Sequence, residues 1–578
     1  MIRLTEVKLA LDHNPADLSA LVCTLLAVPV QEVRRLQVFK RSVDARKAVL
    51  VLVYIVDVEL ATPALEQAAL QRAAGNPHIR PSPDMDYRPP VAAPAGWPAA
   101  PGLRPVVVGF GPCGIFAALL LAQMGFKPIV LERGRKVRER TRDTWGLWRN
   151  GVLQPESNVQ FGEGGAGTFS DGKLWSQIKD PRHLGRKVMG ELVLAGAPAD
   201  ILVDAHPHVG TFKLVKVVEN MRAQIIALGG EIRFEQRVTD LVVEDGPGDA
   251  QGRVRRLRAL TVLDLASGLS HELRAEQVVL APGHSARDTF AMLYERGVAM
   301  VAKPFSIGFR IEHPQGLVDR ARWGRHAGHA LLGAAEYKLV HHAGNGRSVY
   351  SFCMCPGGTV VAATSEPGRV VTNGMSQYSR NERNANAGIV VGIDPADYPL
   401  DGDAFRVSLG LRTGLREGLP PVTGTPHPLA GIVLQRELES RAYVLGGASY
   451  AAPGQLVGDF LANLPSTQWG SVEPSYKPGV TPGDLSLALP TYCVAAIREA
   501  LPVFGRRIPG FDRADAVLTG VETRTSAPLR ITRADDMQSS NVHGLYPAGE
   551  GAGYAGGILS AGVDGIRVAE ALAQSLAA

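Results

Sequence analysis

The chain has 578 residues, of which 45% are hydrophobic and 20% charged, and its formal net charge is +5. This length and composition allow several globular domains and exclude a disordered chain, and the mild charge is no argument for a nucleic-acid partner. Five cysteines without a disulfide framework, no signal peptide and no apolar run near the ~18 residues of a bilayer span predict a cytoplasmic protein without a membrane segment.

The first 75 residues predict a small α+β module, with strand-like segments at 4–11 and 49–60 and helical segments at 16–26 and 64–74. A group of basic residues stands between the two strand segments: Arg34, Arg35, Lys40, Arg41, Arg46 and Lys47. Such a group either binds an anion such as nucleic acid or forms a solvated face. Acidic residues nearly balance the basic ones in this part of the chain, so we favour the solvated face.

Residues 76–104 are rich in proline, which predicts an extended linker. Directly after it, the β-branched run Val106–Val108 leads into a glycine turn and then into a helix rich in Ala and Leu at 115–124. A second apolar strand ends at Glu132. This order of strand, G-x-G-x-x-G turn, helix, strand and acid is the fingerprint of a dinucleotide-binding fold.

Each residue of the fingerprint has a physical role. Gly109 permits the tight turn, Gly111 leaves the backbone open to a pyrophosphate, and Gly114 lets the helix pack against the strand. The N-terminus of the helix offers free N–H groups and a partial positive charge to phosphates. Glu132 is placed to accept hydrogen bonds from the ribose hydroxyls of an adenosine. The pattern therefore predicts a dinucleotide site that disfavours a 2′-phosphate.

The rest of the chain predicts a nucleotide-binding domain interrupted by a second domain. Helices and a strand-rich meander complete a first part at residues 105–300. Residues 301–508 predict a β-rich α+β substrate domain, and residues 509–578 return to the first sheet with a late strand and a closing helix. We therefore expect an α/β fold whose main domain is a discontinuous, doubly wound sheet with a β-meander.

A second glycine-rich segment lies near the C-terminus. Gly549-Glu550 follows the late apolar strand, and Gly556, Gly557 and Ile558 precede the closing helix. The N–H groups of such a segment form an anion cradle, and the carboxylate is placed to hold a polyol. The segment resembles the second FAD motif of glutathione-reductase-type flavoproteins. In that motif the acid binds the ribityl chain, a role that the resemblance gives to Glu550, although Asp is the commoner residue there.

Residues 105–578 as a whole resemble a family of bacterial FAD-dependent dehydrogenases whose substrates are largely unassigned. The resemblance rests on four stretches, at 155–173, 281–288, 355–358 and 548–557. It implies an FAD-binding domain of glutathione-reductase type, a substrate domain and no second nicotinamide-binding domain. Reduction by NAD(P)H would then require transient binding, and a partner protein is the alternative electron donor.

The fingerprint and the resemblance together predict the residues that contact FAD. They are Gly109, Gly111, Pro112, Cys113, Gly114, Glu132, Arg133, Gly164, Gly165, Val238, Ala281, Gly283, Gly549, Glu550, Gly556, Gly557 and Ile558. By resemblance the loop at 162–173 lies along the flavin, which brings Glu163, Asp171 and Lys173 near the reacting face as candidate catalytic groups. Lys173 would stabilise the anionic reduced flavin there. The alternative is a glycine-rich surface loop in which Asp171 and Lys173 only cap turns.

The sequence assigns no role to the other reactive side chains. Cys353-x-Cys355 differs from the CxxC and CxxxxC pairs of disulfide-reductase flavoproteins, and the histidines lack the spacing of a metal site. We expect an oxidoreductase that transfers a hydride between an organic substrate and flavin N5. Two alternatives stay open: a nucleic-acid-associated flavoprotein that uses the basic N-terminal residues, and a non-catalytic FAD-binding sensor. The substrate, the electron partner and the oligomeric state are unassigned.

Overall fold

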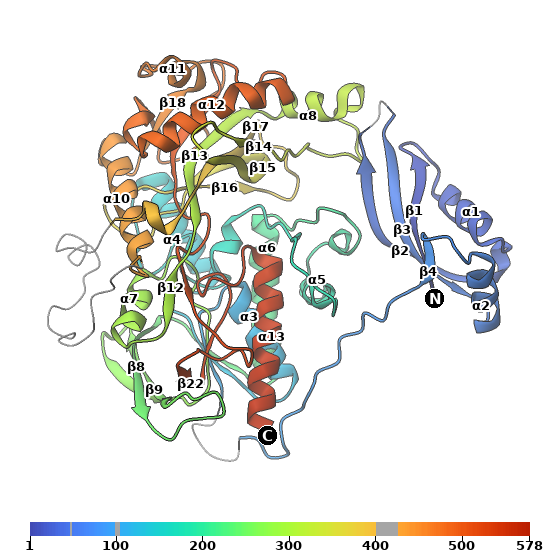
Figure 1. Ribbon diagram of the computed structural model, residues 1–578, viewed down its shortest axis with the longest axis horizontal. Coiled ribbons are helices and arrows are strands. Elements are labelled where there is room, and N and C mark those ends of the chain that lie inside the picture. The colour runs from blue at the N-terminus through green and yellow to red at the C-terminus, as the bar shows by residue number, and fades with distance from the viewer. Residues whose placement is uncertain (47–48, 99–103, 400–425, 578) are drawn as a thin grey trace.

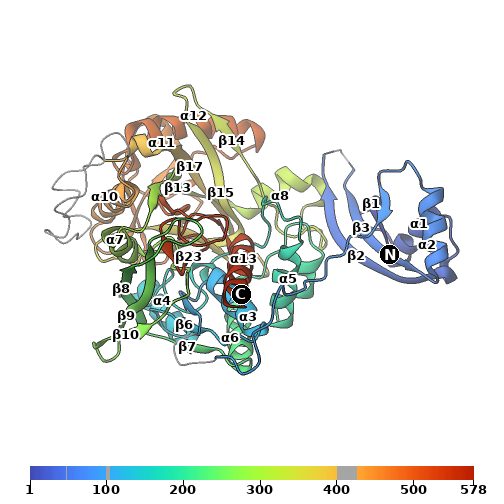
Figure 2. The ribbon, with the colours of Figure 1, turned by 60° about the horizontal axis from the view of Figure 1, so that its bottom comes forward.

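The computed structural model describes residues 1–46, 49–98, 104–399 and 426–577. A small N-terminal domain stands to one side, and the chain that follows it runs along the outside of the molecule to reach the main body (Figures 1 and 2). The main body contains a parallel sheet of five strands and a larger sheet of eight strands.

The N-terminal domain is an antiparallel sheet with two helices packed on one face (Figure 2). Its strands are β1 (Ile2–Ala10), β2 (Val33–Asp44), β3 (Val51–Leu60) and β4 (Ile79–Pro81), and its helices are α1 (Pro15–Leu26) and α2 (Pro63–Arg72). The strands pair in the order β2-β3-β1-β4. The basic residues from Arg34 to Arg41 belong to strand β2 itself, Arg46 follows it, and Lys47 lies outside the described residues.

Strand β2 is an edge strand, and its edge pairs with the main body. The N–H of Arg41 donates to the carbonyl of Val203 at 2.7 Å, and the N–H of Ala205 donates to the carbonyl of Arg41 at 2.9 Å. The Arg41 guanidinium also forms an ion pair with Asp204 at 2.8 Å. Because unpaired edge strands readily pair with other chains, this contact covers part of an otherwise open edge.

The parallel sheet carries the glycine fingerprint. Its strands are β5 (Val106–Val108), β6 (Ile129–Leu131), β7 (Glu231–Arg233), β11 (Val278–Leu280) and β23 (Leu545–Pro547). They pair in the order β23-β11-β5-β6-β7, and every neighbouring pair is parallel. The sheet is therefore discontinuous in sequence, since β23 comes from the far end of the chain.

The two faces of the parallel sheet are covered differently, because side chains alternate along each strand. Val107 packs on one face with helices, which are α3 (Pro112–Gln123), α5 (Leu184–Leu194), α6 (Thr211–Ala227) and α13 (Ile558–Ala577). Val106 and Val108 pack on the other face, against the meander strands β8 (Gln236–Asp245) and β9 (Arg255–Asp264). The expectation of a doubly wound sheet needs correction, because such a sheet carries helices on both of its faces. Here the meander takes the place of the second helical layer.

The meander has two further strands, β10 (Ser270–Arg274) and β22 (Val542–His543), both paired with β9. The stretch that follows β9 is divided between two sheets, because β10 stays in the meander and Val278–Leu280 joins the parallel sheet as β11. The helices α4 (Val137–Asn150) and α7 (Arg287–Glu295) and the short pair β12 (Met300–Ala302) and β21 (Leu529–Ile531) complete this part.

The eight-stranded sheet forms the second half of the main body. Its strands are β13 (Phe305–Pro314), β14 (Val340–His342), β15 (Ser348–Ala362), β16 (Thr372–Ser376), β17 (Asn384–Ile393), β18 (Ala452–Leu456), β19 (Val480–Pro482) and β20 (Val517–Glu522). The helices α8 (Gln315–Trp323), α10 (Ala430–Leu445), α11 (Val457–Ala462) and α12 (Thr491–Arg507) lie around it (Figure 1).

Strand β20 shows that the second domain extends past the expected boundary at residue 508. It pairs with β13 and β18 in the eight-stranded sheet, so the chain has not returned to the first sheet at residue 509. The return follows β20, after about residue 525. The two halves of the body also share one hydrophobic core, in which Val106 of β5 and Ile307 of β13 are both fully buried. None of the helices in the described ranges combines the length and the apolar character that a bilayer crossing requires.

Candidate functional site

A cavity of about 470 Å³ lies between the parallel sheet and the eight-stranded sheet. Residues directly after β5, β6, β11 and β23 line one side of it, and residues of β15, β16 and β20 line the other. In open α/β sheets, ligands bind in the crevice at the carboxyl ends of the parallel strands. The cavity lies at this position, and its volume is within the usual range of ligand pockets, which is roughly 300–1,000 Å³.

The glycine turn after β5 forms part of the cavity wall. Gly109 has a φ of +96°, and a Cβ there would lie 2.3 Å from the carbonyl oxygen of Ala281. A Cβ at Gly114 would lie 1.9 Å from the carbonyl oxygen of Gly109. At Gly111, by contrast, the nearest atom outside the turn is the Cα of Gly165, at an ordinary 3.6 Å. The fold requires Gly109 and Gly114, whereas a Cβ at Gly111 would make only an ordinary contact.

Glu132 lines the cavity beside this turn and organises the loops around it. One carboxylate oxygen accepts the N–H of Phe110 at 2.8 Å, and the other accepts the N–H groups of Gly134 at 2.8 Å and Gly162 at 3.0 Å. Its neighbour Arg133 also lines the cavity. Ion pairs with Glu156 and Asp288 hold the Arg133 guanidinium in place.

The C-terminal glycine segment closes the cavity at the start of α13. The N–H of Gly549 donates to Asp564 at 2.8 Å, and a Cβ at Gly549 would lie 2.8 Å from the Cβ of Cys113. A Cβ at Gly556 would meet nothing within 4 Å. Glu550 lines the cavity, and burial raises the pKa of its carboxyl to about 7. This segment therefore presents open backbone and one acid that titrates near neutral pH.

Most of the residues expected to contact a dinucleotide line this one cavity. They are Gly109, Gly111, Pro112, Cys113, Glu132, Arg133, Gly165, Val238, Ala281, Gly283, Glu550, Gly556, Gly557 and Ile558. Gly114, Gly164 and Gly549 stand behind the lining, where they permit close packing of the backbone. At Gly164, for example, a Cβ would lie 2.1 Å from the hydroxyl of Thr168.

Glu163 does not lie where a catalytic group is expected. Its side chain is fully buried outside the cavity lining, and it accepts the N–H of Val137 at 2.7 Å and a guanidinium N–H of Arg222 at 2.6 Å. Burial raises the pKa of its carboxyl. Because Val137 begins α4, Glu163 serves to fix that helix end.

Asp171 and Lys173 line the cavity and reach across it to the second half of the body. Asp171 forms an ion pair with Arg380, and Arg380 also binds Glu336 at 2.8 Å. The ammonium of Lys173 donates to the carbonyl of Met354 in strand β15. Both side chains therefore help to hold the glycine-rich loop against the eight-stranded sheet.

The second half of the body supplies lining residues that sequence reasoning did not identify. They are Phe352, Cys353, Asn373, Glu522, Arg524 and Thr525. Two signals were available, the Cys353-x-Cys355 pair and the Cys355–Gly358 stretch, but neither indicates which strand faces the glycine turn. Neither Glu522 nor Arg524 lies in a recognisable sequence motif. Only the pairing of β20 with β13 brings them to the cavity.

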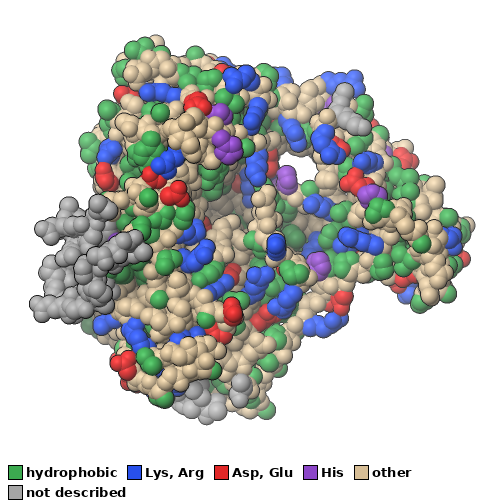
Figure 3. Space-filling view, in the orientation of Figure 1, with side chains coloured by type: hydrophobic (Ala, Val, Ile, Leu, Met, Phe, Trp, Pro, Cys, Tyr) green, Lys and Arg blue, Asp and Glu red, His purple; other side chains and the backbone are tan. Residues whose placement is uncertain are grey.

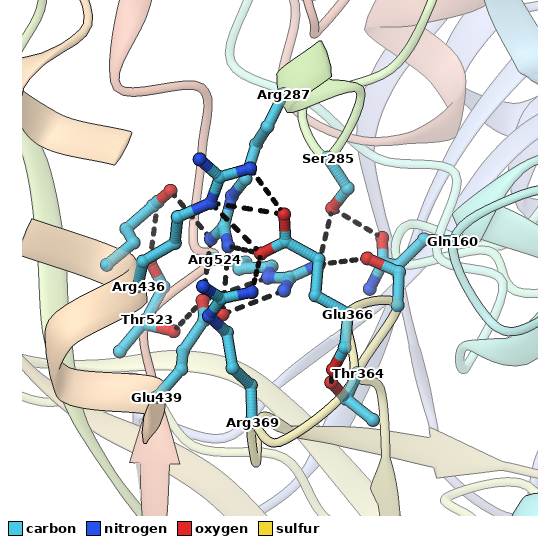
Figure 4. Close-up of polar contacts among 12 residues, drawn as sticks. Gln160, Ser285, Arg287, Thr364, Glu366, Arg369, Arg436, Glu439, Thr523 and Arg524 are labelled. Carbon is cyan, nitrogen blue, oxygen red and sulfur yellow. Dashed lines mark hydrogen bonds and ion pairs between the residues drawn. The ribbon is translucent and has the colours of Figure 1, made fainter. Parts of the chain in front are cut away.

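A buried cluster of charged residues stands beside the cavity and joins the two halves of the body (Figure 4). Glu439 of α10 binds Arg287 at 2.7 Å and Arg524 at 2.8 Å. Arg524 also donates to the hydroxyl of Ser285 at 3.1 Å, and Arg287 binds Glu366 at 2.6 Å. Since Ser285 and Arg524 line the cavity, this cluster sets the position of one wall relative to the other.

Comparisons with known proteins agree with a flavoprotein. Residues 304–525 match the family described as "FAD-dependent protein, C-terminal domain-like". The match ends where β20 gives way to the return of the chain. Residues 1–59 match a domain of unknown function, DUF8436.

Similar proteins cover nearly the whole chain. An uncharacterized protein of Clostridium beijerinckii is 44% identical over 571 residues, which are 98% of each chain. Among solved structures, a quinol fumarate reductase of E. coli is 13% identical, with a TM-score of 0.34, over 82% of this chain and 70% of its own. A 3-ketosteroid dehydrogenase of Rhodococcus jostii RHA1 is 13% identical, with a TM-score of 0.33, over 84% of this chain and 100% of its own.

Proposed function

The chain belongs to the family of its uncharacterized Clostridium relative, and its residues 304–525 match a family of FAD-dependent proteins. On this basis we propose that it is an FAD-dependent oxidoreductase that transfers a hydride between an organic substrate and flavin N5. The match at residues 304–525 supports FAD as the cofactor. The reaction and the roles of individual residues are the parts that we add.

The observation that carries the proposal is the open backbone at Gly111. Two of the three fingerprint glycines are explained by contacts within the protein, but a Cβ at Gly111 would make only an ordinary contact, and Gly111 lies on the cavity wall. A pyrophosphate against this backbone, at the N-terminus of α3, explains why the site needs a glycine. Gly556, open on the same cavity before α13, supports a second close approach of a ligand to backbone.

The groups that line each end of the cavity suit the corresponding end of an FAD molecule. At one end Glu132 and Val238 would hold the adenosine, with the carboxylate directed to the ribose hydroxyls. At the other end Glu550 would hold the ribityl chain, and the N-terminus of α13 would face the ring. The donors are backbone amides and the acceptors are carboxylates, which suits a ligand with a pyrophosphate and several hydroxyls.

Bound FAD would supply a reversible hydride acceptor and donor, which no amino-acid side chain provides. The residues of the chain itself position the reaction. Lys173 carries a positive charge on the ring side of the cavity, which would favour negative charge on a reduced flavin. Asp171 and Arg380 fix the loop that carries Lys173, and the Glu439 cluster fixes the opposite wall.

An absorbance experiment tests the proposal. The purified protein is expected to show the flavin bands and to release FAD on denaturation. Anaerobic addition of a panel of oxidisable compounds, with NADH and NADPH included, is then expected to reveal a compound class that bleaches these bands. A colourless protein that FAD does not reconstitute would contradict the proposal.

The nucleic-acid alternative is not favoured. In strand β2 and after it, Arg34 pairs with Glu59, Arg41 with Asp204 and Arg46 with Asp44. Figure 3 shows acidic side chains among the basic ones on the N-terminal domain. A charge that already has an acidic partner contributes less to the binding of a phosphate backbone, so this face does not have the character of an RNA-binding strip.

A further inference from the structure

Strand β15 is irregular where it borders the cavity. Phe352 pairs with Gly388 of β17 and Cys355 pairs with Asn386, so three steps along β15 match two along β17. The extra residue forms a β-bulge, a feature that redirects a side chain. Cys353 lies within it, with a φ of +43°, a left-handed conformation that is uncommon for residues other than glycine. The bulge brings Cys353, which is partly exposed, to the cavity wall.

A buried arginine holds this bulge from behind. The Arg310 guanidinium donates to the carbonyl of Cys353 at 2.9 Å and to Glu522 at 2.7 Å. It also donates to the amide oxygens of Asn386 and Asn373, both at 3.1 Å, and to the second carboxylate oxygen of Glu522 at 3.3 Å, so all five N–H groups of the guanidinium are used. Strained backbone that is held by several fixed contacts is characteristic of functional sites.

The groups around Cys353 favour its thiolate. A hydrogen bond with Cys355, together with the charges of Arg310 and Lys173, lowers the pKa of the Cys353 thiol to about 5. Burial acts in the opposite direction, and so does the negative charge of Asp171.

Glu522 and Glu550 are the other acids that face this thiol, and burial raises the pKa of both. Cys355, two residues along the strand, is fully buried, and its pKa is raised well above the ordinary value. The surroundings thus favour the thiolate at Cys353, which lines the cavity, and the thiol at Cys355, which lies behind it.

The geometry points to Cys353 as the acid–base group of the substrate site. In the oxidative direction its thiolate takes a proton from the substrate while a hydride leaves the same substrate for flavin N5, so that the substrate loses two electrons and two hydrogens in total. In the reductive direction the thiol returns that proton. Arg310 and Lys173 are positioning residues, since they act through the bulge and its charge. This assignment rests on the proposed function, because it needs the flavin on the facing side of the cavity.

The first test is the pH dependence of alkylation of the FAD-loaded protein by iodoacetamide, with peptides quantified by mass spectrometry. Between pH 8 and pH 6 the rate at Cys353 is expected to change less than twofold, whereas a thiol with an ordinary pKa near 8.5 would slow roughly 80-fold. Lys173→Met is expected to move the profile of Cys353 to higher pH. A Cys353 rate that falls tenfold or more in the wild-type protein overturns the inference.

The second test asks whether Cys353 faces the flavin. In the wild-type protein the flavin absorption is expected to change with a midpoint near pH 5 as the thiolate gains its proton. Cys353→Ser is expected to remove this change, and Cys355→Ser, the matched control on the same strand, to retain it. An unaltered titration in Cys353→Ser would show that another group is responsible and would overturn the inference.

The third test uses the compound that bleaches the flavin. Loss of an acid–base group typically slows the chemical step by about 10²–10⁴-fold, so Cys353→Ser is expected to retain FAD and to be reduced at least 100-fold more slowly. Reduction within threefold of the wild-type rate would overturn the inference. Failure of the proposed function is a separate result, because it would appear as absence of FAD from every variant, while the alkylation profile of Cys353 could still be measured on the FAD-free protein.

Discussion

The proposed adenosine end of the cavity is built mainly from residues close together in the sequence, whereas the proposed ring end is built from distant ones. Gly109, Gly111 and Glu132 lie within one strand–helix–strand unit, in which Glu132 accepts the N–H of Phe110 at 2.8 Å. Around the ring end, Lys173 from the glycine-rich loop contacts Met354 of β15, and the cluster around Glu439 joins α10 to the start of α7. The first end depends on local geometry, and the second depends on how the two halves of the body are packed.

This difference predicts that the two ends fail in different ways. A change at the adenosine end is expected to remove the ligand and leave the fold intact. A change at the interface of the two halves is expected to destabilise the fold, since buried ion pairs are costly to break there. Matched substitutions at each end make the comparison quantitative.

The largest effect is expected from Glu439→Gln, which leaves Arg287 and Arg524 buried without their shared carboxylate. Breaking a buried pair of this kind costs about 3–5 kcal/mol of unfolding free energy. Urea unfolding measures the loss, and Glu437→Gln is the control, because Glu437 lies on the same helix in an exposed pair with Arg441. Below the urea transition the variant is expected to retain FAD. Equal midpoints for the two variants would contradict the importance of the cluster.

The same residue predicts a pH dependence. Burial would raise the pKa of Glu439, but Arg287 and Arg524 outweigh it and lower that pKa to about 2. Because the pKa in the folded protein lies below the ordinary value, the carboxylate stabilises the fold at neutral pH, and this stabilisation is lost as the pH falls from about 4.5 towards 2. Glu439→Gln is therefore expected to have a flatter stability profile than the wild type over this window.

Gly111→Val is expected to have an effect of comparable size, but on FAD binding instead of on the stability of the fold. The φ and ψ of Gly111, −81° and −175°, are accessible to valine, and a Cβ there makes only an ordinary contact with Gly165, so the fold is expected to survive. A side chain there would hold the pyrophosphate away from the N–H groups at the start of α3, which is expected to weaken FAD binding by about 100-fold or more. Flavin content after gel filtration measures this. Gly190→Val, at a glycine of α5 with open space around it, is the control that keeps its flavin. Normal flavin content in Gly111→Val would contradict the pyrophosphate assignment.

The two ends also differ in how far the sequence predicts them. Gly111 and Glu132 are predictable because strand, turn and acid follow one another, so local spacing fixes their geometry. Glu522 is not predictable, since its place depends on the register of β20 against β13. Glu163 lies within a recognisable glycine-rich loop, yet the turn directs its side chain to Val137 and away from the cavity. Sequence motifs indicate which loop lines a site, but they do not fix which way each side chain points.

The smallest effect is expected from Glu550→Gln in the FAD-free protein. Burial raises the pKa of Glu550 to about 7, so the folded protein holds this proton more tightly than the unfolded chain does. The stabilisation is then complete below pH 4.5 and is lost as the pH rises to about 7, at about 1.4 kcal/mol per pKa unit at most. Above pH 7 the variant is expected to be more stable than the wild type. Glu272→Gln, exposed on β10, is the control, and parallel pH profiles in all three proteins would contradict the assignment.

The position of β23 has a consequence for synthesis of the protein on the ribosome. Strand β11 cannot pair with β23, its neighbour in the sheet, until the ribosome has extended the chain from Leu280 to Leu545. At about 5–20 residues per second this takes roughly 10–50 seconds, during which the edge of β11 is open to other nascent strands. Because the start of α13 is made later still, the lining of the cavity is complete only after residue 558 has been synthesised. A slow codon stretch or a fusion near residue 545 would therefore lower the yield of loaded protein without altering any contact of the finished fold.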